Sequence, residues 1–337
     1  MSAHDRTELF SISQEVADAV ASGLPVVALE SSGVAHGLPY PLNLQTALDM
    51  HKVIRAGGAV PARIGIDGGR FVVGMSDAQV EEFATTADLP KVSTRDIGPA
   101  LASGGPGGTT VSAALVAAAR TGIEVFAVAG IGGVHFGAQR SFDVSADLIE
   151  FTRHRIATVC AGAKSVLDPE LTLEYLETQG VPVVGYRCDD FPAYYCVSSG
   201  RPNPRRTDDI EELAASVRLH WAAGNRGGFL VTHPIAEQDA LPSEEIYALI
   251  HQKQAEAESE GVSGAEMTPY ILSAVSAATK GRTAEANRSV LLSTCALAAE
   301  VAVAMSRRGA PVGAACPAST TRCCSTSTAP WWTPPAA

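Results

Sequence analysis

A lysine follows an apolar run near the middle of the chain, in the segment IATVCAGAKSVLDPELTLEYLE (residues 156–177). Small residues and then Lys164 come directly after the run, before Asp168 and Pro169 open a helix. An ammonium at the apolar rim of a sheet loses hydration, which favours the free amine, a nucleophile toward carbonyl-like carbon. Lys164 is therefore a Schiff-base candidate; the alternative is a lysine that extends from the sheet edge into solvent. The chain has only five lysines against twenty arginines, so positions that need mere positive charge are mostly arginine.

A second candidate is Glu30, which ends the apolar run VVALE and precedes a Ser/Gly loop that contains His36. A carboxyl group at the rim of a dry sheet holds its proton more readily than one in water, so it can serve as a general acid. The alternative is a glutamate that caps a helix or forms a salt bridge.

A glycine-rich loop opens a helix in the segment LASGGPGGTTVSAALVAAA (residues 101–119). Free backbone N–H groups and the positive end of the helix dipole then meet at one point, which suits a phosphate. The Gly-Lys-Ser/Thr ending of a Walker A loop is absent, and a plain tight turn remains the alternative. Lys91, just upstream, would supply a countercharge or lie in solvent.

Another glycine loop carries His135 in the segment VFAVAGIGGVHFGAQRSFDVSADL (residues 125–148), and Asp143, Ser145 and Asp147 follow at the start of a helix. Asp143 and Asp147, with His135 close by, form a candidate site for a hard divalent cation held through oxygen ligands and water. Ser145 or Asp143 could instead cap the helix. The GxGxxG spacing of a dinucleotide site and its acidic partner are absent, so we expect no dinucleotide.

The elements that position these residues are apolar runs alternating with amphipathic segments. The runs are apolar on both faces, which is typical of strands covered by helices on both sides. The sequence predicts an α/β protein, a single domain with a three-layer α/β/α arrangement and a central mostly parallel or mixed sheet. Predicted strands cover residues 25–30, 62–66, 125–130, 156–161, 182–186 and 229–233, and predicted helices cover 44–54, 169–180, 243–260 and 284–308.

Length and composition bound the organisation. With 337 residues and 46% hydrophobic content, the chain can bury one sizeable core, and we expect one catalytic domain over residues 1–309. From about residue 309 the composition shifts to Pro, Ser, Thr, Cys and Ala without periodicity, so residues 310–337 are predicted to be a disordered, low-complexity tail.

Charge and hydropathy exclude several classes of protein. The net charge is −11 and the basic residues form no stripe, so a nucleic-acid polymer is not an expected partner. No uninterrupted run of about eighteen apolar residues and no signal core occurs, so we expect no membrane association and a cytoplasmic location. The seven cysteines form no CxxC pair or zinc-type spacing and are interpreted as reduced thiols.

A series of motifs resembles, in this order, the pseudouridine-5′-phosphate glycosidase (indigoidine synthase A-like) family. The motifs are ALESSGVAHGLPYP, AVPARIGI, KVSTRD, GGTTVSAAL, VFAVAGIGGVHFGA, FDVSADL, VCAGAKSVLD, TLEYLETQGVPVVGY and THPIAEQ. The match covers residues 10–308 and is specific, because many separate motifs agree in sequence, spacing and order. The segment PAYYCVSSGRPNPRRTDD (residues 192–209) departs from the family pattern, so selectivity for the base could differ.

The resemblance implies an enzyme that reversibly cleaves the C–C glycosidic bond of pseudouridine 5′-phosphate to uracil and ribose 5-phosphate. It also implies a homotrimer and one Mn²⁺ per subunit. Lys164 would form a Schiff base with the ring-opened ribose, Glu30 would donate a proton, and Asp143 would hold the metal. The implied substrate contacts are Lys91, Val111, His135, Ser145, Ala146, Asp147 and Asn287.

Two other functions are compatible with the sequence. A synthase that joins ribose 5-phosphate to another acceptor in natural-product biosynthesis would use the same residues. A phosphosugar-binding regulator would need the glycine-rich loop but neither Lys164 nor Glu30.

Overall fold

The computed structural model describes residues 9–262 and 267–307. The chain up to Arg307 forms one compact unit. The predicted tail, residues 310–337, lies outside the described residues, so the division of the chain into a catalytic domain and a tail stays a prediction.

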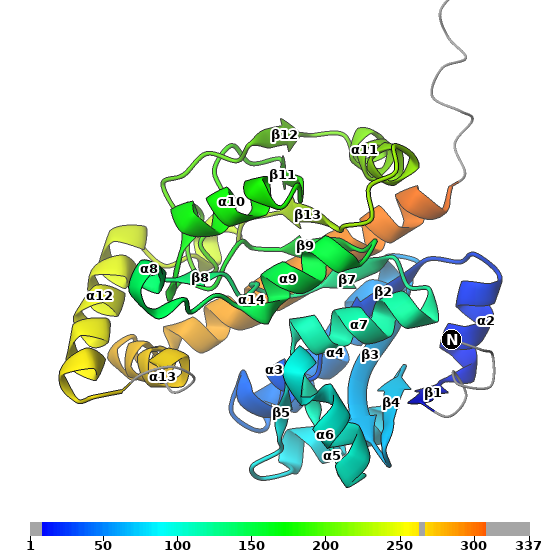
Figure 1. The fold of residues 1–337 in the computed structure, drawn as a ribbon, viewed down its shortest axis with the longest axis horizontal. Helices are drawn as coiled ribbons and strands as arrows, with labels where there is room; N and C mark the ends of the chain where they lie inside the picture. The colour runs from blue at the N-terminus through cyan, green and yellow to red at the C-terminus, as the bar shows by residue number, and fades with distance from the viewer. Residues whose placement is uncertain (1–8, 263–266, 308–337) are drawn as a thin grey trace, which may run out of the picture. The chain divides into compact units, whose positions relative to one another are not determined.

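A mixed sheet of nine strands forms the middle layer (Figure 1). Its spatial order is β1-β4-β3-β2-β7-β9-β13-β11-β12. Every neighbouring pair is parallel except β3 and β4, which form an antiparallel hairpin. The strands are β1 (Phe10–Ile12), β2 (Val26–Leu29), β3 (Val60–Asp67), β4 (Arg70–Val73), β7 (Val125–Ala127), β9 (Ala157–Cys160), β11 (Val183–Tyr186), β12 (Arg205–Thr207) and β13 (Phe229–Thr232).

The six predicted strands all exist, as β2, β3, β7, β9, β11 and β13. The three short strands β1, β4 and β12 lie at or near the sheet edges and were not predicted from the sequence. Edge strands bury less apolar surface than central ones, so β12, with the sequence RRT, carries no apolar pattern to detect.

Helices cover both faces of the sheet, as the three-layer prediction requires. One face packs against α2 (Gln14–Ala21), α7 (Val111–Thr121), α9 (Ala146–Arg153) and α10 (Pro169–Thr178). The other packs against α4 (Leu42–Ala56), α11 (Ile210–Ala222) and α14 (Arg282–Ser306). Strand β2 shows why both faces are apolar: Ala28 belongs to the first cluster, whereas Val27 and Leu29 belong to the second. Side chains alternate across a strand, so a strand covered on both sides is apolar at most positions.

The longest of these helices, α14, is the one helix among the described residues that is long and apolar enough to cross a membrane by length and composition. Half of its most apolar window is buried inside the protein. It contacts α4 and α11 and lies against β2, β7 and β9. These contacts are those of a core helix, and they explain its apolar composition.

The remaining helices, the 3₁₀ turns and two small sheets complete the described part of the chain. The helices are α3 (Ser32–His36), α5 (Asp77–Thr85), α6 (Ile97–Ser103), α8 (Ala138–Ser141), α12 (Ser243–Ser259) and α13 (Met267–Ala278), with the 3₁₀ turns Thr94–Asp96 and Glu237–Asp239. Two small sheets pair β5 (Lys91–Val92) with β6 (Gly108–Thr109), and β8 (Val134–His135) with β10 (Leu167–Asp168).

The four predicted helices are present as α4, α10, α12 and α14. The cap predicted at Asp168 is confirmed, because its carboxylate accepts a hydrogen bond from the N–H of Leu171 at 3.0 Å. The four cysteines within the described residues are all free thiols, as expected.

Candidate active site

The candidate catalytic residues gather where three neighbouring parallel strands end. Glu30 follows β2, the loop with His135 follows β7, and Lys164 follows β9, and these strands are adjacent in the order β2-β7-β9. Carboxyl ends of parallel strands meet at one edge of the sheet, which is where α/β proteins bind their ligands. The sheet therefore brings together residues more than a hundred positions apart.

Lys164 is held through its backbone and not through its ammonium. Its N–H donates to the carbonyl of Ile131 at 3.0 Å, and its own carbonyl accepts from the N–H of Leu167 at 2.9 Å. Within residues 9–262 and 267–307, the half-buried ammonium makes no hydrogen bond or ion pair. Burial, and to a lesser extent the charge of Lys164, lower the pKa of Lys91 and of His135. The backbone of Lys164 is thus fixed at the sheet edge, while its side-chain nitrogen has no hydrogen-bond partner among the described residues.

The Glu30 carboxylate lies on the first turn of α3. It accepts from the hydroxyl of Ser32 at 2.7 Å and from the N–H of Gly33 at 3.0 and 2.8 Å. A Cβ atom at position 33 would lie 2.4 Å from Glu30 Oε1, so a larger residue here would displace the carboxylate. The capping interpretation of Glu30 is therefore correct as geometry, and it also fixes the carboxylate at the sheet edge.

Asp147 joins two parts of the site. Its carboxylate accepts from the N–H of Ser112 at 2.9 Å and from the N–H of Gly132 at 2.8 Å. Burial raises its pKa, and the nearby Lys164 ammonium together with the two N–H donors opposes that shift. Both oxygens are therefore engaged by the protein. The sequence had suggested that Asp147 and Asp143 share a cation site, but Asp147 is not free for that role.

The start of α7 offers donors to an anion. Among the described residues, the N–H groups of Val111 and Ala113 have no protein acceptor, while Asp147 already takes that of Ser112. The pairing of β5 with β6 places Lys91 opposite Gly108 of the glycine-rich loop. Desolvation, and next the charge of Lys164, lower the pKa of Lys91. Phosphate binding at this loop stays a prediction, and free N–H groups at the start of a helix are compatible with it.

His135 and Asp143 face each other in the loop that follows β7. Their nearest atoms, Nδ1 and Oδ2, lie 3.8 Å apart, which is beyond hydrogen-bond distance. Burial and the Lys164 ammonium lower the pKa of His135, and the Asp143 carboxylate opposes them.

No group of three or more His, Cys, Asp or Glu side chains in the described part of the chain could hold a metal ion. A single carboxylate with an imidazole beside it does not fit a closed protein cage. The pair does fit a hard cation that keeps most of its water or takes phosphate oxygens.

The GIGG loop is glycine-rich for packing reasons. A Cβ atom on Gly132 would lie 2.1 Å from Ser145 Oγ, and one on Gly133 would lie 2.4 Å from Thr172 Oγ1. Ser145 caps α9 by accepting from the N–H of Asp147 at 3.2 Å, and Ala146 is the first residue of that helix. The glycines of this loop therefore allow it to pack closely against the side chains of Ser145 and Thr172.

Two residues near the site escaped the sequence analysis. Tyr194 is buried and donates its hydroxyl to Asn287 Oδ1 at 2.9 Å. Arg63, 2% exposed on β3, donates to the carbonyl of Glu30 at 2.7 Å and to His51 Nε2 at 3.2 Å. The only available signal for Arg63 was a charged residue inside the apolar run VPARIGI.

Comparison with known proteins identifies the family. The family model described as Indigoidine synthase A like protein matches residues 15–304. The chain belongs to this family. A relative named pseudouridine-5′-phosphate glycosidase from Dickeya dadantii (strain 3937) is 56% identical over 297 residues, 88% of this chain and 94% of that protein. The enzyme of the same name from Escherichia coli (strain K12) is 45% identical over 88% of this chain and 95% of its own length.

Indigoidine synthase A-like structures also share the fold. The prealnumycin C-glycosynthase AlnA, solved in complex with ribulose 5-phosphate, is 44% identical with a TM-score of 0.84, over 89% of this chain and 97% of that one. The family resemblance and the fold class expected from the sequence are thus confirmed.

Proposed function

We propose that this protein cleaves, reversibly, the C–C glycosidic bond of pseudouridine 5′-phosphate to give uracil and ribose 5-phosphate. The proposal is supported by the names of the relatives, one of them 56% identical over most of the chain. It is supported equally by the residues at the sheet edge, since a lysine without an ion-pair partner, a fixed carboxylate and an anion-binding helix start suit a phosphorylated sugar.

The phosphate would anchor the substrate at the start of α7. The free N–H groups of Val111 and Ala113 and the ammonium of Lys91 supply donors and positive charge. Ser145 and Ala146, at the start of α9, lie beside this point because Asp147 joins α9 to Ser112 of α7. Anchoring one end of the sugar phosphate orients C1′ toward Lys164.

Opening of the ribose ring is the first covalent change. Glu30 donates a proton to the ring oxygen as the C1′–O4′ bond breaks, and the amine of Lys164 forms a bond to C1′. A C-glycoside has no electronegative leaving atom on the base side, so acid assistance to the base alone cannot release it.

The nitrogen of Lys164 then supplies the electrons that the base side lacks. Its lone pair forms a C1′=N imine as the C1′–C5 bond breaks, and the bonding pair leaves on C5 of uracil, which takes up a proton. Water adds to the imine carbon and releases ribose 5-phosphate, which restores the amine. The sum is pseudouridine 5′-phosphate plus water giving uracil plus ribose 5-phosphate.

The family resemblance implies Mn²⁺, and Asp143 would hold it with His135 beside it. Such an ion supplies charge that fixes water and substrate oxygens in place. His135 and Asn287 would complete the substrate pocket. We further propose that the protein is a homotrimer and that it is located in the cytoplasm. Sedimentation equilibrium tests the homotrimer, because a stable monomer under dilute conditions would overturn that assembly.

The observation that carries the proposal is the Lys164 ammonium at the carboxyl ends of the parallel strands, which has no ion-pair or hydrogen-bond partner in the part of the chain that the structure describes. Intact-protein mass spectrometry tests it after incubation with ribose 5-phosphate, Mn²⁺ and borohydride. We expect one reduced pentose-phosphate adduct in the natural chain, none in Lys164→Ala, and less adduct when uracil is present. Absence of any adduct in the natural chain would refute the imine mechanism.

A second candidate is a C-ribosylating synthase, favoured by the similarity to a C-glycosynthase with a bound pentulose phosphate. It predicts an adduct at Lys164 that uracil does not discharge. The same mass measurement therefore separates the two functions.

A further inference from the structure

The loop that carries Tyr194 is bonded directly to the segment that carries Lys164. The N–H of Tyr194 donates to the carbonyl of Ala161 at 2.9 Å, and the buried hydroxyl of Ser165 donates to the carbonyl of Ala193 at 2.9 Å. These two bonds lie on either side of Lys164 in the sequence. The position of Tyr194 is therefore tied to that of the candidate nucleophile.

Tyr194 itself has an unusual backbone and a fully packed ring. Its φ is +60°, a left-handed conformation that L residues other than glycine seldom adopt, and its exposure is 6%. A Cβ atom on Gly130 would lie 2.5 Å from Tyr194 Cδ2 and 3.4 Å from Lys164 Cγ. The tyrosine ring and the lysine stem are thus neighbours across Gly130. Such conformations persist where the surroundings fix them, and they concentrate at functional sites.

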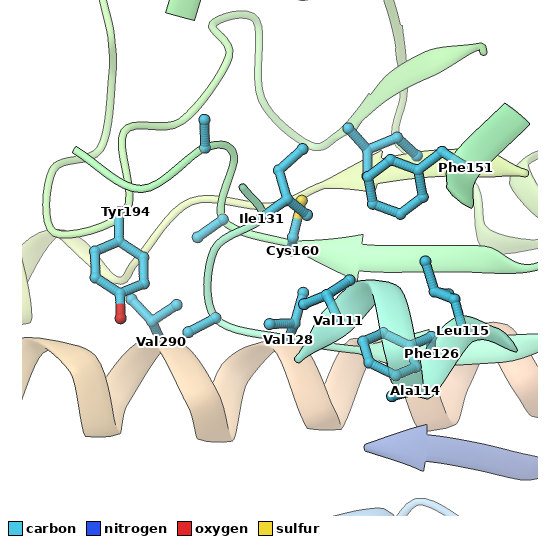
Figure 2. Close-up of a cluster of buried hydrophobic side chains, with 14 of the residues drawn as sticks. Val111, Ala114, Leu115, Phe126, Val128, Ile131, Phe151, Cys160, Tyr194 and Val290 are labelled. Carbon is cyan, nitrogen blue, oxygen red and sulfur yellow. The ribbon is translucent and has the colours of Figure 1, made fainter. Parts of the chain in front are cut away.

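The hydroxyl of Tyr194 is hydrogen-bonded to the side-chain amide of Asn287. Figure 2 shows the hydroxyl directed toward α14, where it donates to Asn287 Oδ1 at 2.9 Å. Burial, and next the Tyr195 phenol, raise the pKa of Tyr194 well above its usual value, so the phenol keeps its proton. Asn287 is 7% exposed, and its Nδ2 has no partner among the described residues. With Oδ1 occupied, the amide presents two N–H donors to whatever fills the site.

We propose that Tyr194 is a positioning residue that fixes the Asn287 amide so that its N–H groups donate to a carbonyl oxygen of the departing base. This inference rests on the function proposed above. When the C1′–C5 bond breaks, the electron pair spreads onto the carbonyls of the base, so a donor aimed there stabilises the transition state more than the ground state. Without the tyrosine hydroxyl, the amide can turn over and direct its own oxygen at the carbonyl.

The test separates sugar capture from bond cleavage. Tyr194→Phe keeps the ring but removes the hydroxyl, so the borohydride-trapped adduct with ribose 5-phosphate should form as in the natural chain. The kcat for uracil release from pseudouridine 5′-phosphate should fall about tenfold. Tyr186→Phe is the matched control, because Tyr186 is a buried tyrosine in the cluster on the opposite face of the sheet. Both of its readouts should stay unchanged.

Further variants test the coupling of the two residues. In an Asn287→Ala background, adding Tyr194→Phe should cost no further activity, because the amide it orients is gone. Asn287→Asp keeps an acceptor for Tyr194 but loses the donors, so its kcat should fall at least as far as that of Tyr194→Phe.

Three results would overturn the proposal: a natural kcat in Tyr194→Phe, fully additive losses in the double variant, or natural activity in Asn287→Asp. Failure of the proposed function looks different. In that case the natural chain itself would form no adduct and release no uracil.

Discussion

Asp147 has two candidate roles, one as a hydrogen-bond acceptor that stabilises the fold and one as a contact to the substrate. The variant Asp147→Ala measures which role dominates. The change removes the acceptor for two N–H groups, those of Ser112 and Gly132, at 2.9 and 2.8 Å. Hydrogen bonds to charged groups contribute roughly 1.5–3 kcal/mol each, so the pair is worth about 3–6 kcal/mol. The raised pKa of Asp147 shows that burial opposes its charge, so we expect a loss of about 3–4 kcal/mol.

Urea unfolding followed by circular dichroism at neutral pH measures this loss as a lower midpoint at an unchanged m-value. The matched control is Asp143→Ala, since the Asp143 side chain is 38% exposed and its removal should change the unfolding free energy by no more than about 0.5 kcal/mol. Equal stability of the two variants, with the damage to Asp147→Ala confined to KM, would refute the reasoning and make Asp147 a substrate ligand.

The pH dependence gives an independent check on Asp147. Because its folded pKa is raised above the usual 3.8, the unfolded chain releases this proton first as pH rises. Stability then falls with pH from about pH 4 up to the folded pKa and is level above it. Asp147→Asn does not titrate, so this portion of the slope should be missing from its unfolding free energy between pH 4 and pH 7. An identical slope in the natural chain and the variant would show that Asp147 titrates normally.

Three further predictions concern the surroundings of the site. Burial, followed by Arg63, lowers the pKa of His51 from 6.5 to about 3, so the stability that neutral His51 contributes is present above pH 6.5 and is lost as pH falls toward 3. In urea titrations, His51→Gln should flatten the slope of unfolding free energy against pH by up to about 1.4 kcal/mol per pH unit. An unchanged slope would contradict this prediction. Gly132→Ala should lower the unfolding free energy by about 1–3 kcal/mol, because the new Cβ would lie 2.1 Å from Ser145 Oγ. A melting temperature equal to that of the natural chain would show that the loop can shift to make room. Removal of divalent ions by EDTA should abolish uracil release until Mn²⁺ is restored. Asp143→Ala should raise the Mn²⁺ concentration for half-activation at least about tenfold. Full activity in EDTA would show that the reaction needs no metal.

The sequence by itself determined the central strands, the long helices and the chemistry of the candidate residues. The six central strands were readable because both of their faces are buried, so most of their positions are apolar, with the buried Arg63 in β3 as an exception. Lys164 and Glu30 could be picked out because each is a charged residue at the end of such a run. The helix cap at Asp168 was readable because capping depends on residues only three positions apart.

Only the tertiary structure decided which of these residues meet. Asp147 resembled a metal ligand in the sequence, yet its oxygens bind the N–H groups of two distant segments, which no local pattern reveals. Tyr194 and Asn287 are 93 positions apart, and their hydrogen bond exists because the loop after β11 and helix α14 pack at the same edge of the sheet. Local patterns record what each segment buries, whereas hydrogen-bond partners across the site depend on how the layers pack, and that is a property of the whole chain.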